Sequence, residues 1–210
     1  KAKKYIFTCG TVETINFFLK NKNYIKSKKN VGKYFQDHIG IYIGDIKIID
    51  KKKFYDLFVN GTYNGAKYQP KLFFQKKISN ILLSASGEFK FFSKHKKNID
   101  FFKKNISSLM NNKRINSLFN LIISAIVLNY KFLEILFYYL FKNKIKPYYD
   151  QGIYFYIQSE QIPQKNSSIR YNKKKNKFIL NWAINGKELK FIKLFAIKVK
   201  RFLEKEKIGK

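Results

Sequence analysis

Residues 39–48 read IGIYIGDIKI and carry the clearest secondary-structure pattern of the chain. Isoleucines alternate with other residue types through this stretch, except where Gly44 and Asp45 interrupt the alternation. Alternation with period two places side chains on one face of a strand, and a glycine-containing interruption is typical of a tight turn. The stretch therefore predicts a β-hairpin, from Ile39 through the turn to Ile48, with three isoleucines facing the core: Ile41, Ile43 and Ile48.

The residues on either side of this hairpin predict short helices. Val12, Ile15, Phe18 and Leu19 recur at helical spacing after Gly10, which predicts an amphipathic helix over residues 11–20 capped by Thr11. A basic loop over residues 20–33 leads to the hairpin. After it come three consecutive lysines (Lys51, Lys52 and Lys53), one predicted helical turn over 54–59 and a glycine-rich stretch over 61–70.

The second part of the chain has a different pattern. Residues 100–110 predict a helix, and residues 152–158 and 177–184 predict strands, with a lysine-rich turn at 173–175 between them. A final amphipathic helix is predicted from apolar residues at helical spacing: Leu189, Ile192, Phe195 or Ala196, Val199, and Phe202 or Leu203. The expected fold is α+β: a core over 1–77 with a small antiparallel sheet and an N-terminal helix, then a mostly helical extension over 78–210 that can include a second β-hairpin.

Residues 115–141 form a long apolar segment whose only charges are Lys131 and Glu134. Its uncharged part, residues 115–130, is shorter than the ~20 residues that a membrane-spanning helix needs. A longer span would bury both charges at a cost of about 2.5–3.5 kcal/mol each at the bilayer centre. A buried helix or helical hairpin is the favoured interpretation, and a membrane anchor is the alternative.

The charge of the chain limits its partners. Among 210 residues, 44 are Lys or Arg and 13 are Asp or Glu, which gives a formal net charge of +31. Such self-repulsion disfavours a free compact protein and indicates a polyanionic partner. Hydrophobic residues make up 45% of the chain and aromatic residues 18%, which is too much for a disordered tail. A folded, nucleic-acid-bound protein is expected.

No constellation of residues predicts catalysis, a metal site or a cofactor. Cys9 is the single cysteine, and Cys9 with His38 is the nearest approach to a nucleophile and base. The loop Gly61–Lys67 lacks the spacing of a phosphate-binding loop. No small-molecule substrate is expected, and a basic nuclease is disfavoured because paired metal-binding carboxylates are not evident in the sequence.

Residues 25–77 combine cationic and aromatic side chains. They contain twelve Lys and four Asp, interleaved with aromatic residues that include Tyr34, Phe35, Tyr42, Phe54, Tyr55, Tyr63 and Tyr68. Lysines supply sequence-independent affinity for phosphates by releasing counterions, and exposed rings can stack on unpaired bases. Rings in such mixed clusters are more often core, so stacking stays an alternative.

The stretch from Lys26 to Lys77 resembles the small-subunit ribosomal protein family numbered nineteen, in its bacterial and organellar form. Residues 27–30 (SKKN) look like the family's basic segment, residues 40–43 (GIYI) fall on its first strand, and residues 45–47 (DIK) are similar to its turn. Phe58-Val59 follows at the family's spacing, and the segment 66–71 (AKYQPK) falls on the family's last motif after one inserted residue.

The resemblance implies a non-catalytic protein of the subunit head that binds rRNA beside a neighbour of the family numbered thirteen. By position it implies RNA contacts for Lys28, Lys29, Lys47, Lys67 and Lys71, and charge alone adds Lys33, Lys51, Lys52 and Lys53. Only three of the basic residues are Arg, and Lys, Asn, Ile, Phe and Tyr dominate, as an A+T-rich organellar genome would produce. We therefore expect a mitochondrial small-subunit ribosomal protein. The alternatives are another organellar ribosomal protein of either subunit and a membrane-associated protein anchored by residues 115–141.

Overall fold

The fold of this chain, taken from a computed structural model, is mixed α+β, as predicted. The structure describes residues 6–21, 23, 29–64, 66–78, 80–97, 100–101, 104, 134–135, 137–138 and 141–210. The chain forms two compact units, which we call unit 1 and unit 2. Unit 1 comprises Lys1–Ile39, Gln75–Ser84 and Ser159–Phe191, and unit 2 comprises Gly40–Phe74, Ala85–Gln158 and Ile192–Lys210. The predicted division of the chain at residue 77 stays a prediction.

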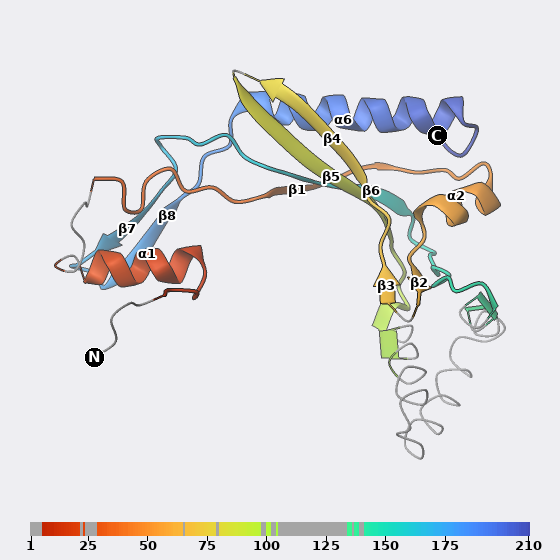
Figure 1. The fold of residues 1–210 in the computed structure, drawn as a ribbon, viewed down its shortest axis with the longest axis horizontal. Coiled ribbons are helices and arrows are strands. Elements are labelled where there is room, and N and C mark those ends of the chain that lie inside the picture. The colour runs from red at the N-terminus through yellow and green to blue at the C-terminus, as the bar shows by residue number, and fades with distance from the viewer. Residues whose placement is uncertain are drawn as a thin grey trace, which may run out of the picture. The chain divides into compact units, whose positions relative to one another are not determined.

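Helix α1 (Thr11–Lys20) forms where the apolar spacing predicts it. Its cap was predicted wrongly: Gly10 occupies the N-cap position, and no side chain there accepts a hydrogen bond. Three of the four predicted apolar residues are half-buried, whereas Val12 is exposed. The helix packs against strand β7 (Ser168–Asn172), which pairs with β8 (Lys177–Asn181) in unit 1 (Figure 1).

Four strands form an antiparallel sheet in the order β1-β6-β5-β4. Their bounds are Ile39–Asp45 for β1, Leu72–Ile78 for β4, Ile81–Phe91 for β5 and Ile153–Ser159 for β6. Most of the sheet lies in unit 2. Strand β6 confirms the strand predicted over 152–158, and its residues alternate between buried and half-buried from Ile153 to Ser159.

The predicted hairpin over residues 39–48 is wrong. Its first half forms β1, but the neighbour of β1 is β6, which is more than a hundred residues away along the chain. The second half pairs elsewhere: Ile46 N–H donates to the Ile153 carbonyl, and Ile48 forms an isolated bridge with Gly209. Ile41 is 38% exposed, so it does not face the core, while Ile43 and Ile48 are half-buried. Alternation identifies a strand but not its partner.

Helix α2 (Lys51–Phe58) replaces the predicted single turn over 54–59 and begins three residues earlier. It begins there because the Asp50 side chain caps it, accepting a hydrogen bond from Lys53 N–H at 3.0 Å. The three consecutive lysines therefore form the first turn of a helix. Phe54 and Phe58 are the buried residues of this helix.

The core of unit 2 is aromatic. The ring of Phe54 lies 4.9 Å from that of Phe89, and Phe89 lies 5.1 Å from Phe155. Phe155 in turn contacts Phe195 of helix α6 (Gly186–Lys205) at 5.6 Å. Edge-to-face and tilted aromatic pairs of this kind each add about 0.5–1.5 kcal/mol beyond the area that they bury. This cluster holds α2 and the sheet together.

Helix α6 confirms the predicted final helix, although its buried residues differ in part. Ile192, Phe195, Val199 and Leu203 are buried as predicted, but Leu189 is 50% exposed. Glu188, which the pattern did not single out, is fully buried in unit 1. It accepts hydrogen bonds from Asn185 N–H at 2.7 Å and from Ile162 N–H at 2.6 Å, while the Asn185 side chain accepts from Lys187 N–H. This reciprocal arrangement is a capping box.

Two small hairpins complete the described fold. Strands β2 (Gly61–Tyr63) and β3 (Ala66–Tyr68) pair in unit 2, where a glycine-rich loop was expected. Strands β7 (Ser168–Asn172) and β8 (Lys177–Asn181) pair in unit 1. The lysine-rich turn is confirmed, but it joins β8 to β7, a strand that was not predicted, and not to β6.

Two predicted segments lie mostly outside the described residues. The helix expected over 100–110 lies outside the described residues except for Asp100, Phe101 and Lys104. The apolar segment over 115–141 lies outside them except for Glu134, Ile135, Phe137, Tyr138 and Phe141. Core burial and membrane anchoring of this segment both stay predictions. In the part of the chain that the structure describes, no helix combines the length and apolar character needed to cross a membrane.

Candidate nucleic-acid interface

Lysines from two distant parts of the sequence meet in unit 2 through backbone pairing. Lys47 and Lys210 exchange two hydrogen bonds, with N···O distances of 2.9 and 3.0 Å. Asp50 N–H donates to the Ile208 carbonyl at 3.2 Å, which places the start of α2 beside residues 207–210. We call the five exposed lysines that these segments carry the lysine patch: Lys47, Lys51, Lys52, Lys207 and Lys210.

The side chains of the lysine patch are available to a ligand. None of the five forms an ion pair with another described residue. Lys53 is different, because its ammonium lies 3.0 Å from the Glu206 carboxylate and also donates to the Glu206 carbonyl. Lys53 therefore joins the first turn of α2 to Glu206. Of the three consecutive lysines, only Lys51 and Lys52 carry ammonium groups without an ion pair to another described residue.

The sequence analysis missed Lys207 and Lys210. No local motif marks them, and only the pairing of residues 46–50 with 208–210 brings them next to the predicted lysines. The relevant signal in the sequence is the basic run over residues 198–210, which was assigned to the outer face of a helix.

The β2–β3 hairpin carries a second group of predicted residues. Lys67 is exposed and pairs with Thr62 across the hairpin, and Lys71 is exposed just before β4. Tyr63, next to the turn, is 74% exposed. The Lys144 ammonium lies 5.3 Å from the centroid of the Tyr68 ring, a cation–π distance, and donates to the Asp56 carbonyl. A partly exposed ring beside a cation, here Tyr68 with Lys144, suits an unpaired base and its phosphate.

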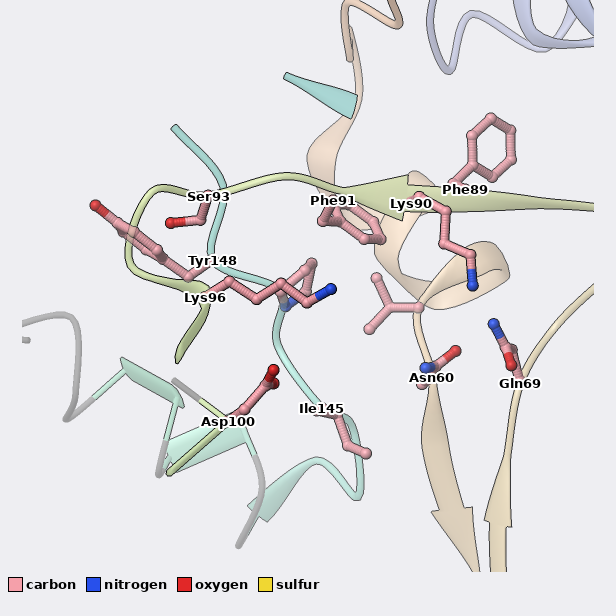
Figure 2. Close-up of a pocket in the computed structure, with 12 residues that line it drawn as sticks. Asn60, Gln69, Phe89, Lys90, Phe91, Ser93, Lys96, Asp100, Ile145 and Tyr148 are labelled. Carbon is pink, nitrogen blue, oxygen red and sulfur yellow. The ribbon is translucent and has the colours of Figure 1, made fainter. Parts of the chain in front are cut away.

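A cavity of about 180 Å³ lies in unit 2 at the base of this hairpin. Its wall includes Asn60, which precedes β2, and Gln69, which follows β3. Figure 2 shows Lys96 reaching across the cavity, with Lys90 on the wall near the two amides. Lys90 is paired with Glu88 at 2.7 Å, whereas Lys96 forms no ion pair with another described residue; the Asp100 carboxylate also lines the cavity. Amides and an ammonium offer hydrogen bonds to a phosphate or a base edge.

Two side chains of unit 2 have shifted pKa values. Burial, then a hydrogen bond with Tyr149, raises the pKa of Tyr55. For Asp150, desolvation raises the pKa, but hydrogen bonds from Lys94 N–H and Ser93, and the charges of His95 and Lys94, outweigh it. The net result is a lowered pKa for Asp150, so this carboxylate stays charged and fixes the 93–95 turn beside the cavity.

The remaining predicted residues belong to unit 1 or lie outside the described part. Lys29 and Lys33 are exposed in unit 1, and Lys28 is not among the described residues. The predicted set is thus divided between the units, and the lysine patch together with the β2–β3 hairpin holds most of it. RNA contact by each of these lysines stays a prediction.

The catalytic alternatives find no geometry among the described residues. The Cys9 thiol is exposed and contacts the Thr14 hydroxyl, whereas the His38 ring lies 4.0 Å from the Asp37 carboxylate. Cys9 and His38 are therefore each beside another residue, and not in contact as a nucleophile–base pair would be. Within the described ranges, no three His, Cys, Asp or Glu residues are grouped so as to hold a metal ion.

Comparison with known proteins adds no relative. No protein-family model, no curated protein and no solved structure matches this chain. The function is therefore argued from the residues themselves.

Proposed function

We propose that this chain is an rRNA-binding structural protein of an organellar, mitochondrial small ribosomal subunit. The observation that carries the proposal is the lysine patch: five exposed lysines, free of ion pairs with described residues, on a chain of net charge +31. Each ammonium is a compact point charge without the two-pronged geometry of Arg, so backbone phosphates are its natural ligands. The patch neutralises packed phosphates while the aromatic core of unit 2 keeps it in shape.

The narrower placement in the family numbered nineteen rests on the resemblance of residues 26–77. It predicts crosslinks to rRNA of the subunit head and to a neighbour of the family numbered thirteen. Sedimentation of the chain with organellar ribosomes, followed by crosslink mapping, tests this placement. Crosslinks to large-subunit rRNA would replace it with another organellar ribosomal protein, and retention in carbonate-extracted membranes would replace both.

A salt titration of RNA affinity tests the lysine patch directly. For each phosphate contact, the slope of log affinity against log salt steepens by about 0.7 for single strands and 0.9 for duplexes. The triple variant Lys47→Gln/Lys51→Gln/Lys52→Gln should flatten the slope by about 2. A control variant with the same loss of charge takes exposed lysines of α6: Lys190→Gln, Lys193→Gln and Lys205→Gln. Equal slopes for the two variants would reject the patch as the contact surface.

A further inference from the structure

The β7–β8 hairpin lies in a stretch of unit 1 whose charged residues are all basic. Residues 161–187 contain seven Lys or Arg residues and no Asp or Glu. Five of these cations belong to the hairpin itself: Arg170, Lys173, Lys174, Lys175 and Lys177. All five are exposed, and none forms an ion pair with a described residue. No acidic side chain within the hairpin offsets their charge.

The basic turn of this hairpin is structured. The Asn172 side chain accepts a hydrogen bond from Lys175 N–H at 3.1 Å, and Asn176 N–H donates to the Lys173 carbonyl at 3.3 Å. The Tyr171 hydroxyl lies 2.6 Å from the Asn176 side-chain oxygen and donates to it. Three consecutive lysines are therefore displayed from a defined turn, which lowers the entropy cost of ordering them on a ligand.

The aromatic rings of the hairpin are already occupied. Tyr171 and Phe178 face each other across the strands, with ring centroids 4.9 Å apart. The Lys20 ammonium of α1 lies 5.7 Å from the Tyr171 ring and 5.3 Å from the Phe178 ring. Since both rings pack on each other and beneath Lys20, the hairpin can contact phosphates through its cations but has no open ring on which a base could stack.

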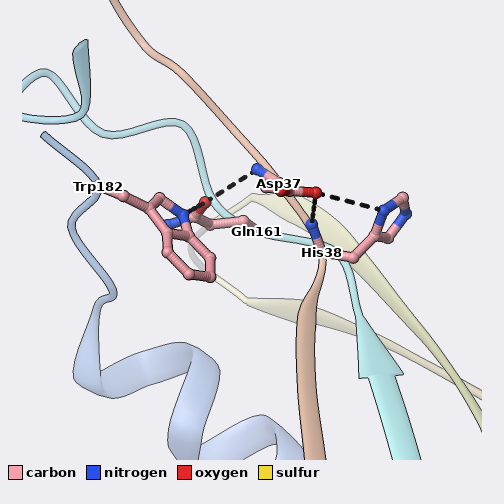
Figure 3. Close-up of polar contacts among 4 residues, drawn as sticks. All are labelled: Asp37, His38, Gln161 and Trp182. Carbon is pink, nitrogen blue, oxygen red and sulfur yellow. Dashed lines mark hydrogen bonds and ion pairs between the residues drawn. The ribbon is translucent and has the colours of Figure 1, made fainter. Parts of the chain in front are cut away.

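The base of the hairpin is fixed by Gln161, which is 5% exposed. Its side-chain oxygen accepts hydrogen bonds from Trp182 Nε1 at 2.7 Å and from Asp37 N–H at 3.3 Å (Figure 3). Its side-chain nitrogen donates to the Ala183 carbonyl. The residues directly after β8 are therefore tied to residues 36–37, so the basic turn projects from an anchored stem.

We propose that the β7–β8 hairpin binds the sugar-phosphate backbone of double-stranded RNA, and this inference rests on the proposed function. A two-stranded stem with cations along its edge and at its turn matches backbone contacts that depend on shape, which is how proteins recognise A-form duplexes. Single strands are instead bound with the help of stacked aromatic rings, and here those rings are occupied. The hairpin is a contact that the sequence resemblance does not include.

A protein partner is the competing occupant of this surface. Ile179 is 50% exposed and Leu180 is 53% exposed on β8, so the hairpin also presents apolar area. Five exposed cations in the hairpin, and the lack of Asp and Glu in residues 161–187, favour RNA, because charged residues are depleted at the centre of protein interfaces.

The test uses the full chain and an RNA duplex of about 20 base pairs, longer than the ~16 that double-stranded RNA-binding domains span. The hairpin variant is Lys173→Gln/Lys174→Gln/Lys175→Gln, and the α6 triple variant is its control. Between about 50 and 200 mM salt, the hairpin variant should lose roughly 10- to 100-fold in duplex affinity and flatten the slope by about 2–3. Trp182 fluorescence confirms that unit 1 is folded in both variants.

Four outcomes separate the proposals. A loss of duplex affinity in the hairpin variant, but not in the control variant, supports the inference. If the lysine-patch variant loses affinity and the hairpin variant matches the control, the proposed function stands and this inference is overturned. If neither variant differs from the control, both are overturned. Loss of ribosome association with Ile179→Ser/Leu180→Ser, while the hairpin variant keeps its duplex affinity, would assign the surface to a protein partner instead.

Discussion

The two hairpins of this protein use similar residues in opposite ways. In β2–β3 the ring next to the turn, Tyr63, is 74% exposed, and the exposed Lys67 belongs to the paired strand. In β7–β8 the rings of Tyr171 and Phe178 pair with each other beneath Lys20, and the lysines occupy the turn. The first arrangement offers an open ring for an unpaired base, whereas the second offers phosphate contacts alone.

For the proposed RNA contacts, this difference means that composition alone does not set how each hairpin would bind. Both hairpins come from a chain rich in Lys, Tyr and Phe, and the direction in which each ring points decides what the hairpin can bind. In β7–β8 a neighbouring helix covers the rings, while Tyr63 in β2–β3 remains open to solvent. The predictions below test each side of this contrast.

The largest expected effect is that of Gly32→Ala on the stability of unit 1, because residue 32 packs against β7. Gly32 has a φ of +77°, and an added Cβ would lie 2.2 Å from the backbone carbonyl oxygen of Ile169 in β7. The strained conformation and the backbone clash together should cost about 2–4 kcal/mol of the free energy of unfolding. Urea unfolding followed by the fluorescence of Trp182, the single tryptophan, reports on unit 1 directly.

Gly186→Ala is the matched control for this substitution. A Cβ at Gly186 meets no atom within 4 Å, and the residue begins helix α6. Its unfolding free energy should stay within about 1 kcal/mol of the parent, since alanine favours a helix over glycine. Equal midpoints for the two variants would mean that residue 32 does not pack against β7 as described.

The next effect concerns RNA affinity and the open ring of β2–β3. Tyr63→Ala should weaken binding to a single-stranded RNA by about 1–3 kcal/mol, the usual contribution of one stacked base. Stability should change by less than about 0.5 kcal/mol, because the side chain is on the surface. Tyr63→Phe keeps the ring and should keep the affinity. An unchanged affinity for Tyr63→Ala would leave β2–β3 as a phosphate contact like β7–β8 and remove the contrast.

The sequence predicts part of this fold because some of its signals are local. Helix α6 was predicted because its apolar residues recur at helical spacing from Leu189 to Leu203, and α1 was predicted from the same spacing over a shorter stretch. The first half of the 39–48 pattern correctly gave β1. The partner of β1 was not predictable, because strand pairing depends on contacts between residues far apart in the chain.

The candidate interface was predictable to a similar extent. Lys51, Lys52 and Lys53 were predicted from charge and Lys47 from the resemblance, but the ion pair that occupies Lys53 depends on Glu206 and has no local signal. The basic turn at 173–175 was visible, yet β7 was not predicted. Its residues 168–172 read SIRYN, a short run with little alternation. Which rings are open and which are covered follows from packing and could not be predicted.

We expect the protein to lose stability at alkaline pH because of Tyr55, which lies on α2, before the β2–β3 hairpin. Burial raises its folded-state pKa above the ordinary value of 10.0, so the folded state holds the phenol proton where the unfolded chain loses it. The stabilisation is complete below pH 10 and is lost as the pH rises toward the folded pKa. Between about pH 9 and 11, the thermal unfolding temperature should fall less steeply with rising pH for Tyr55→Phe than for the parent. Parallel curves would contradict the burial of this hydroxyl.

The smallest expected effect distinguishes the covered rings of β7–β8 from open ones. Lys20→Gln removes the ammonium above Tyr171 and Phe178 and should lower the unfolding free energy of unit 1 by about 0.5–1 kcal/mol. Lys20→Arg keeps a cation over the rings and should restore most of this loss. Because Lys20 is directed at the rings, Lys20→Gln should also weaken duplex RNA binding less than Lys174→Gln, although each removes one charge. If the two single variants weaken RNA binding equally, Lys20 faces the RNA as well, and the rings beneath it are open to bases like Tyr63.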